Sequence, residues 1–256
     1  ESIDKISKRG IKKIIISTGG STVSDFGIGM LNYLGASFFN KHNNIIKFKK
    51  RVNCSELKNI KKIDFKKIKI NLKKIKLIIL SDSSVKIIGK FGQVQTFAQQ
   101  KGIYGNEKKI LEKGFINFFK VLSSKSKKKL NINYLGAGGG ICASLYSNFN
   151  ASLVPATKYL FAKINLIKKI KLSNTIISGE GILDKSSFMG KGVGEIIKLA
   201  KHHKKNLILI VGINKYKKLP KSCKIIEINN KNFNLNKNRY FKLLEKKIKN
   251  ELNEKD

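Results

Sequence analysis

The sequence predicts an α/β fold built as two α/β lobes with mainly parallel sheets, of which the C-terminal lobe is Rossmann-like. Short runs of β-branched residues alternate with amphipathic helical patterns along the chain, which is typical of parallel sheets covered by helices. Glycine-rich turns follow several of these runs. From residue 172 onward the strand–helix–strand alternation becomes tight. We therefore expect one lobe at 1–171 and a second at 172–256.

The first lobe contains two expected strands. The runs 11–17 and 75–81 are short, apolar and rich in isoleucine, as expected of buried parallel strands. A glycine-rich turn follows the first run and leads into a helix expected at about 25–34. The lysine-rich stretch 41–71 carries little information, and we interpret it as a connector.

Two further helices belong to this lobe. Residues 108–122 form an amphipathic pattern whose apolar members recur at helical spacing and are expected in the core: Ile110, Leu111, Phe115, Phe118 and Phe119. The glycine cluster at 135–140 opens a second helix that continues through Leu145.

The second lobe alternates strands and helices more closely. Strands are expected at 175–178, 207–211 and 224–228, with helices at about 192–202 and 239–252. The sequence Gly179-Glu180-Gly181 directly follows the first of these strands. The last helix is highly charged, so we expect one of its faces to be solvated.

The net charge of +38 favours anionic partners, so nucleic acid has to be considered. Only three of the 54 basic residues are arginine, at positions 9, 51 and 239. Proteins that read a base sequence use arginine because its planar fork pairs with guanine and phosphate. Lysine, isoleucine and asparagine are instead spread through almost every segment, as AT-rich codons would produce. We expect loose electrostatic attraction to RNA or DNA but no specific nucleic-acid partner.

The cysteines and the hydropathy pattern indicate a cytoplasmic protein. Cys54, Cys142 and Cys223 lack the spacing of metal ligands or of a redox pair, which fits a reducing compartment. No stretch approaches the roughly 20 apolar residues that span a bilayer, and no secretory signal opens the chain, so no membrane partner is expected. Because the chain begins at Glu1 rather than Met, we expect that a preceding segment is missing.

Acidic residues are scarce, and four of the 16 lie beside glycine-rich turns. Asp25 follows the turn at 19–22, Asp82 ends the strand at 75–81, and Glu180 and Asp184 flank Gly181. In open α/β sheets, ligands bind beyond the carboxyl ends of the strands, where all four are expected. The alternatives are a helix cap for Asp25, a turn for Asp82, and a turn or cap for Asp184.

These residues suit phosphoryl transfer, which depends on positioning and charge stabilisation. Asp82, Glu180 and Asp184 are candidate ligands for Mg²⁺, and Lys101 and Lys191 are candidate cations. Glycine turns and helix starts bring backbone N–H groups close to phosphates, and the candidates here are Gly19, Gly20, Gly136, Gly138, Gly139 and Gly140. The Walker A pattern GxxxxGK[ST] does not occur.

Four motifs follow one another along the chain. Residues 17–36 read STGGSTVSDFGIGMLNYLGA, residues 97–102 read FAQQKG, residues 135–145 read LGAGGGICASL, and residues 178–184 read SGEGILD ahead of Gly190-Lys191. In order and spacing they resemble the motifs GGSATNDGGAGMLxALGA, FGPQKGA, GAGAAGGLGAAL and TGEGRLD, with its following GK step, of the glycerate kinase family. The resemblance extends over nearly the whole chain.

The resemblance implies Mg²⁺- and ATP-dependent phosphorylation of glycerate, with 2-phosphoglycerate as the more frequent product, in a cleft between two α/β lobes. Carried over by position, the glycine turns, including Gly179 and Gly181, hold the ATP phosphates. Asp82, Glu180 and Asp184 share metal binding and positioning, and Lys191 neutralises the developing charge. Ser21 and Asp25 line the substrate cleft. A missing N-terminal segment or a second copy of the chain would be the polypeptide partner.

The chain departs from the family pattern at several places. Phe26 replaces a glycine, which is expected to crowd the turn, and Ile182 replaces an arginine. Residues 82–87 read DSSVKI where the family has DVTNPL. The family's front third, with its SFKGS and ADGGEGT segments, has no counterpart, so the general base is expected in that segment. Two alternatives stay open: a decayed or partner-dependent remnant of a glycerate kinase, and a basic nucleic-acid-binding protein.

Overall fold

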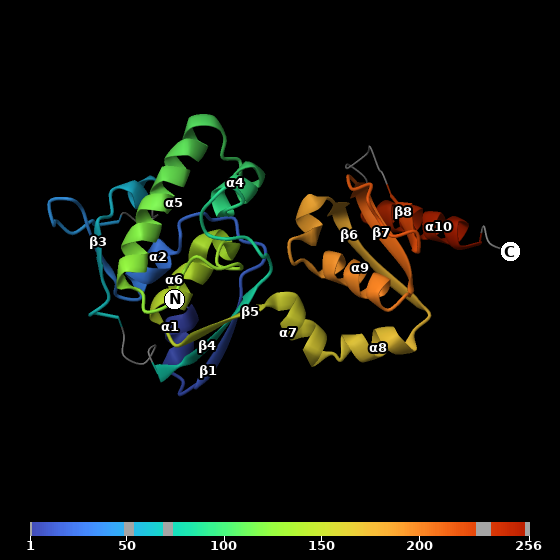
Figure 1. The fold of residues 1–256 in the computed structure, drawn as a ribbon, viewed down its shortest axis with the longest axis horizontal. Coiled ribbons are helices and arrows are strands. Elements are labelled where there is room, and N and C mark those ends of the chain that lie inside the picture. Colours follow the sequence, from blue (N-terminus) through green and yellow to red (C-terminus); the bar gives the residue numbers. More distant parts are fainter. Residues whose placement is uncertain (1, 49–53, 69–73, 229–236, 254–256) are drawn as a thin grey trace. The chain divides into compact units, whose positions relative to one another are not determined.

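The computed structural model describes residues 2–48, 54–68, 74–228 and 237–253. The chain divides into two compact units, Glu1–Tyr159 and Leu160–Asp256 (Figure 1). Each unit contains a three-stranded parallel sheet with helices, so the expected α/β class with mainly parallel sheets is confirmed. The division differs from the expected boundary at residue 172 by about one helix, and the limits of the domains stay a prediction.

The sheet of the first unit has the order β1-β4-β5, from Lys13–Ser17, Lys76–Ser81 and Ala151–Pro155. Both strands expected in this unit are therefore present. The register pairs Ile15 with Ile78 and Ile79 with Leu153. Strand β5 has no counterpart among the expected strands, because its sequence ASLVP is short, ends in proline and lacks an isoleucine run.

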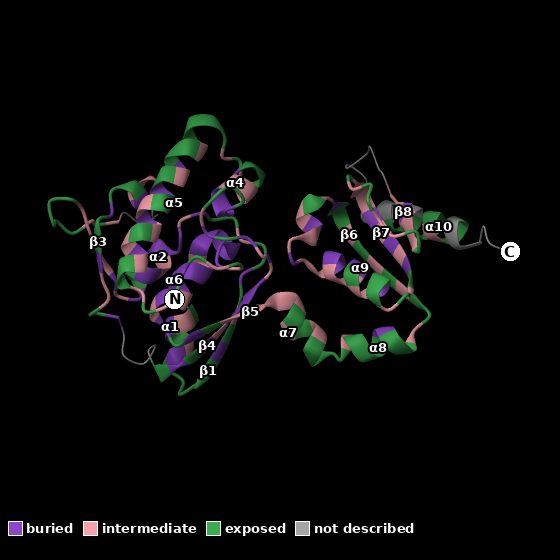
Figure 2. Ribbon diagram, viewed as in Figure 1, coloured by how far each residue is buried: buried purple, intermediate pink, exposed green. Residues whose placement is uncertain are grey.

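Helices α2 (Ile28–Tyr33), α5 (Gly105–Lys125) and α6 (Ile141–Asn148) belong to the same unit and contribute to its core. Leu111, Phe115 and Phe118 of α5 are buried as expected, whereas Ile110 is 42% exposed. Most of α6 is buried, as Figure 2 shows. The apolar pattern of α5 thus identified its core-facing stripe.

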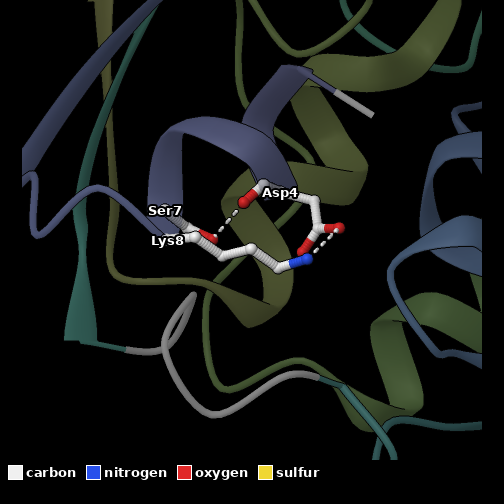
Figure 3. Close-up of polar contacts among 3 residues, drawn as sticks. All are labelled: Asp4, Ser7 and Lys8. Atoms are coloured by element: carbon white, nitrogen blue, oxygen red, sulfur yellow. Dashed lines mark hydrogen bonds and ion pairs between the residues drawn. The ribbon is translucent and has the colours of Figure 1, made fainter.

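Two short helices also belong to this unit, namely α1 (Ser2–Ser7) and α4 (Gln93–Phe97). In α1 the Asp4 carboxylate lies 3.7 Å from the Lys8 ammonium, and the Ser7 hydroxyl donates to the Asp4 carbonyl at 2.7 Å (Figure 3). Asp4 is buried while Lys8 reaches solvent. Because the Lys8 ammonium is solvated, the ion pair contributes little to the stability of the fold.

The expected connector at 41–71 contains regular structure, which corrects that interpretation. Strands β2 (Ser37–Phe39) and β3 (Lys62–Asp64) pair antiparallel, and a 3₁₀ helix spans Cys54–Lys58. The side-chain amide of Asn117 donates to the carbonyls of Leu57 and Ile60 at 2.8 and 2.7 Å, which fixes this segment to α5. The frequent lysines obscure the apolar pattern in the sequence. The few apolar residues that anchor this segment and β2 in the core are Phe38, Leu57, Ile60 and Ile63.

The sheet of the second unit has the order β6-β7-β8, from Thr175–Leu183, Asn206–Asn214 and Cys223–Glu227. Helix α9 (Gly192–His202) connects β6 to β7 and packs Val193, Ile197 and Ala200 into the core of this unit. Helix α8 (Leu166–Leu172) precedes the sheet and α10 (Lys237–Asn253) follows it, while α7 (Ala156–Lys163) crosses the division between the units. The helix expected at 192–202 is confirmed, and all three expected strands are present.

Candidate functional site

The carboxyl ends of β1 and β4 bring the first glycine turn and Asp82 together. Because the two strands are parallel and Ser17 pairs with Leu80, the segments that follow them leave the sheet at the same edge. Thr18 donates to the Leu80 carbonyl through its amide at 3.2 Å and its hydroxyl at 3.1 Å. A Cβ atom on Gly19 would lie 3.2 Å from Asp82 Oδ2. The absence of a side chain at Gly19 therefore leaves the Asp82 carboxylate room beside the exposed turn.

The second glycine cluster packs against the segment that follows this turn. Gly138, Gly139 and Gly140 have φ angles of 61°, 64° and 96°, and they lie in a 3₁₀ segment, Ala137–Gly140, directly before α6. A Cβ on Gly139 would lie 2.0 Å from the Val23 carbonyl oxygen. The second glycine cluster therefore packs closely against the segment that follows the first glycine turn.

Burial restricts what the second cluster can bind. Gly136 and the three glycines of the 3₁₀ segment are buried, whereas Gly19 and Gly20 are exposed. A Cβ on Gly136 would lie 2.3 Å from the Lys86 carbonyl oxygen, so close backbone packing accounts for that glycine. Direct contact of Gly136 and Gly138–Gly140 with a nucleotide stays a prediction.

Asp25 lies at the start of α2. One of its carboxylate oxygens accepts from the Gly27 amide at 2.8 Å and the other from the Gly29 amide at 3.2 Å. The expected helix begins three residues later than predicted, at Ile28, because Asp25 forms the turn that precedes it. The capping role considered for Asp25 is thus present, and its partly buried carboxylate keeps further acceptor capacity.

The expectation that Phe26 crowds the glycine turn is wrong. The Phe26 ring is fully buried, with its centroid 5.0 Å from those of both Phe115 and Phe118. Its amide donates to the Gly139 carbonyl at 2.9 Å. The residue adopts this place at a φ of 57°, a left-handed conformation that costs a non-glycine residue about 1–2 kcal/mol. The ring therefore points away from the turn and packs in the core.

Lys101 places a cation near Asp25 and Asp82. It ends the 3₁₀ turn Gln99–Lys101, and its ammonium donates to the Val23 carbonyl. Burial lowers the pKa of Lys101, while the charges of Asp25 and Asp82 act in the opposite direction. Asp25, Asp82 and Lys101 therefore form one electrostatic cluster beside the exposed Gly19-Gly20 turn. Ser21 also faces Val23, whose carbonyl accepts from its hydroxyl at 3.4 Å.

Cys54 also lies near Asp25 and Lys101, although no sequence pattern points to it. Burial and the charge of Asp25 raise the pKa of the Cys54 thiol, while a backbone hydrogen bond at Ser24 acts against them. The thiol also borders a cavity of about 340 Å³ that is lined in part by Ile103 and Leu111. Its position 29 residues beyond Asp25 in the supposed connector concealed this proximity.

In the second unit, Glu180 lies within a strand rather than after it. Strand β6 continues to Leu183 and pairs Gly179 with Ile210 and Glu180 with Val211, so the predicted end at residue 178 is wrong. Gly179 is needed for packing, since its Cβ would lie 2.2 Å from the Ile210 carbonyl oxygen, whereas Gly181 has open space. Glu180 Oε1 is buried without a hydrogen-bond partner among the described residues. Such an oxygen can accept a ligand's hydrogen bond or bind a cation.

Asp184 and Lys191 meet around the next turn. The Asp184 carboxylate accepts a hydrogen bond from the Ser186 amide at 2.7 Å, and the backbone amide of Asp184 donates to the Ser187 hydroxyl at 3.1 Å. Together these bonds form a capping box for the 3₁₀ turn Lys185–Phe188. Lys191 donates to the Ser186 hydroxyl at 2.8 Å. Burial raises the pKa of Asp184, but hydrogen bonds from Ser186 and the charge of Lys191 together bring it below its usual range. The capping alternative is therefore present.

The three candidate metal ligands fall in both units. Asp82 belongs to the first unit, and Glu180 and Asp184 belong to the second. Within the described residues, no group of three or more His, Cys, Asp or Glu side chains could hold a metal ion. Binding of Mg²⁺ by these three carboxylates stays a prediction. The neutralisation of developing charge by Lys191 stays a prediction as well.

The whole pattern of motifs has a counterpart among known proteins, because the model of the glycerate kinase family matches residues 1–240. The chain belongs to the glycerate kinase family. Curated relatives include the glycerate kinase of Bacillus cereus, 30% identical over 74% of this chain and 50% of the relative. The glycerate 2-kinase of Escherichia coli is 29% identical over 83% of this chain and 55% of the relative. The chain thus spans about half the length of the curated relatives it matches.

A solved structure supports the fold of this glycerate kinase family member. The putative glycerate kinase 2 of Salmonella typhimurium has a TM-score of 0.63 and 23% sequence identity, covering 96% of this chain and 66% of the Salmonella chain. At this identity the likeness concerns the fold alone. Within the described part of the chain, no helix has the length and apolar character needed to cross a membrane.

Proposed function

We propose that this chain is the larger part of an ATP-dependent glycerate kinase, which transfers the γ-phosphoryl group to glycerate with 2-phosphoglycerate rather than 3-phosphoglycerate as the product. The family match and the names of the relatives support the reaction, and the relative named glycerate 2-kinase supports the 2-hydroxyl. Since the matched region covers only about half of the relatives' length, the complete activity is part of the proposal.

The observation that carries this proposal is the cluster of Asp25, Asp82 and Lys101 beside Gly19. Two carboxylates and one partly buried ammonium lie within electrostatic reach of one another at the carboxyl ends of β1 and β4. This edge is where α/β sheets bind ligands. A site that must hold both an anionic acid and a phosphate needs cations and exposed backbone N–H groups, and Lys101 and the Gly19-Gly20 turn offer both.

The residues of this cluster can divide the work. Lys101 would release the Val23 carbonyl and pair with an anionic oxygen of glycerate or ATP, which compensates the burial of its ammonium. Asp25 has acceptor capacity left for a glycerate hydroxyl. Ser21, which is only partly buried, would donate to the same substrate.

The remaining candidates fit a metal–nucleotide. Mg²⁺ in phosphoryl-transfer sites usually takes one or two carboxylates, with water and phosphate oxygens as the other ligands. Asp82 in the first unit and Glu180 in the second are each carboxylates of the kind that such a donor set uses, and Glu180 Oε1 has no hydrogen-bond partner among the described residues. Asp184 lies near a cation, Lys191, that would favour a phosphate. When bound, Mg²⁺ would neutralise phosphate charge, and Gly181, which has open space around it, would leave the strand surface accessible to the nucleotide.

The experiment combines the chain with Mg²⁺-ATP and D-glycerate and measures ADP formation that depends on glycerate, with the phosphorylated product identified by ³¹P NMR. Calorimetric titration with Mg²⁺-ATP and with glycerate measures binding separately. We expect Asp82→Asn to reduce turnover at least about a hundredfold, because it removes a carboxylate that would hold the Mg²⁺, and the neutralisation of phosphate charge in the transition state is worth several kcal/mol. Asp64→Asn, in β3, is the matched control.

The outcomes separate the alternatives. Absence of turnover, even after addition of the polypeptide that corresponds to the relatives' unmatched half, would refute the kinase proposal. Binding of neither ATP nor glycerate would select the decayed remnant, for which Ile182 and the DSSVKI stretch are the supporting observations. A cytoplasmic location belongs to the proposal and is supported by the three unpaired cysteines.

A further inference from the structure

A buried hydrogen bond between two polar side chains lies next to Asp25 in the fold. The side-chain amide of Gln93 donates to the Ser24 hydroxyl at 3.0 Å, across 69 residues of sequence. Gln93 is fully buried and Ser24 is 3% exposed. Gln93 Oε1 is without a partner among the described residues, so the side chain stays buried although its oxygen is unsatisfied. Burial of a polar side chain at such a cost indicates a role beyond filling space.

The pair connects the two segments that carry the cluster. Ser24 directly precedes Asp25. Gln93 is the first residue of α4, which continues through Ala98 into the 3₁₀ turn that ends at Lys101. The amide of Lys101 donates to the Ala98 carbonyl at 3.0 Å, so the two helical turns are joined by their own backbone. A bond between Gln93 and Ser24 therefore fixes the Lys101 segment relative to Asp25.

A second, exposed bond joins the same segments, since the Lys101 ammonium donates to the carbonyl of Val23. The two bonds differ in what they can do. The Lys101 ammonium has to leave Val23 in order to bind a substrate anion, whereas the buried Gln93 amide has no access to a ligand. Only the buried bond can keep the segments in register while Lys101 changes partner.

We propose that Gln93 is a positioning residue, which acts through Ser24 to hold the Asp25 turn in register with the Lys101 segment. Gln93 does not touch the substrate in this proposal. The proposal rests on the proposed function, because Asp25 and Lys101 need a fixed separation only if they bind one substrate. Its structural part, however, can be tested without ATP or glycerate.

Cys54 reports on the position of the Asp25 turn. Its thiol pKa is raised by burial and by Asp25, and it borders a cavity that a small alkylating reagent can enter. If the turn moves away, burial and the charge of Asp25 weaken together with the opposing backbone hydrogen bond at Ser24. Burial and Asp25 are the larger effects, so the thiol pKa falls and the reactive thiolate becomes more abundant at a given pH. Cys223, in the second unit, serves as an internal reference in the same sample.

The test measures iodoacetamide alkylation of Cys54 relative to Cys223 by mass spectrometry between pH 7 and 10, in Ser24→Ala, Gln93→Leu and the double variant. Ser7→Ala removes another buried hydroxyl of the same unit and is the control. We expect each single variant to react about threefold faster at Cys54 at pH 8, the double variant no faster than the faster single one, and the control unchanged.

Unchanged Cys54 reactivity in folded Ser24→Ala would overturn the proposal, and so would additive effects in the double variant. Ser24→Ala decides the question alone if Gln93→Leu fails to fold, because it deletes a single oxygen. In an active enzyme, both single variants should lower kcat/KM for glycerate about tenfold, whereas Ser7→Ala should leave it unchanged. A shifted thiol profile without any wild-type turnover would support the positioning role and reject the kinase function.

Discussion

Lys101 differs from the exposed lysines of the chain because it is partly buried between two carboxylates. Burial lowers its pKa, whereas Asp25 and Asp82 favour the charged ammonium and raise it. In Asp25→Asn one opposing charge is lost while the burial remains, so we expect the pKa of Lys101 to fall further. The neutral amine is the form that acylates, and the labelling of Lys101 at pH 8 should therefore increase about threefold.

Peptide mapping after brief acylation at several pH values measures this labelling residue by residue. Lys128 is the internal reference, since burial alone lowers its pKa and its ammonium donates to the carbonyls of Phe149 and Ala151. Asp64→Asn is the control variant, because Asp64 is not among the groups that shift the pKa of Lys101. Slower labelling of Lys101 in Asp25→Asn would contradict the electrostatic cluster.

Gly139 is the residue at which the site tolerates a side chain least. An alanine there would adopt a φ of 64° and place its Cβ 2.0 Å from the Val23 carbonyl oxygen. Gly10→Ala is the matched control, because its φ is 71° but no atom lies within 4 Å of the new Cβ. We expect Gly10→Ala to cost about 1 kcal/mol of unfolding free energy from backbone strain alone, and Gly139→Ala about 3 kcal/mol or more.

Urea denaturation followed by circular dichroism measures both values, provided that the slope with denaturant stays constant. Equal losses in the two variants would show that the contact between the glycine cluster and Val23 is looser than the structure describes. A larger loss in Gly139→Ala would support the close packing that holds the Lys101 acceptor in place.

At the level of elements, strand β6 offers a comparison of two glycines on either side of Glu180. A Cβ on Gly179 would lie 2.2 Å from the Ile210 carbonyl oxygen, whereas Gly181 has nothing within 4 Å, and neither has a left-handed φ. We expect Gly179→Ala to separate β6 from β7 locally and to cost about 2–3 kcal/mol. Gly181→Ala should be neutral or slightly stabilising, because alanine restricts the unfolded chain more than glycine does.

Hydrogen exchange of the β6 and β7 amides distinguishes these two variants. Faster exchange in Gly179→Ala and unchanged exchange in Gly181→Ala are expected. If Gly181→Ala loosens the sheet just as much, then packing does not explain why glycine stands at position 179.

The sequence predicted elements where local patterns and tertiary packing agree. Strands β1, β4, β7 and β8 have apolar runs, and α5 and α9 have clear apolar stripes, so all six were expected. The antiparallel pair β2–β3 was not expected, since its three-residue strands are stabilised by pairing and by the Asn117 contacts of the adjoining segment rather than by any local apolar run. The extension of β6 was also missed, because glycines that usually mark a turn pair here with β7.

The candidate site was predictable in its residue types but not in its contacts. Asp25, Asp82 and Lys101 were selected because rare acids and a family motif stand beside glycine turns. The proximity of Cys54, and the bond between Gln93 and Ser24, depend on packing between segments that are distant in sequence. No periodicity or spacing carries that information, and it becomes visible only when the fold brings these segments together.

For the whole molecule, the excess of positive charge is the property that acts at the longest range. A net charge of +38 will attract any polyanion, but most of it comes from lysines that are spread along the chain. Lysine neutralises phosphates without reading bases, and only three arginines are available for base contacts. The charge therefore predicts association with nucleic acid that is governed by salt, whatever the enzymatic activity.

Fluorescence anisotropy with two 20-base-pair duplexes of unrelated sequence tests this prediction. Each neutralised phosphate releases a counterion, so the affinity should fall steeply with salt, by about a hundredfold or more between 50 and 200 mM. The two duplexes should bind equally at every salt concentration, since the contacts are with the backbone. A preference for one duplex that persists at 150 mM salt would contradict the prediction and favour a nucleic-acid-binding function. Competition by Mg²⁺-ATP would then show whether the duplex and the proposed kinase site share the same lysines.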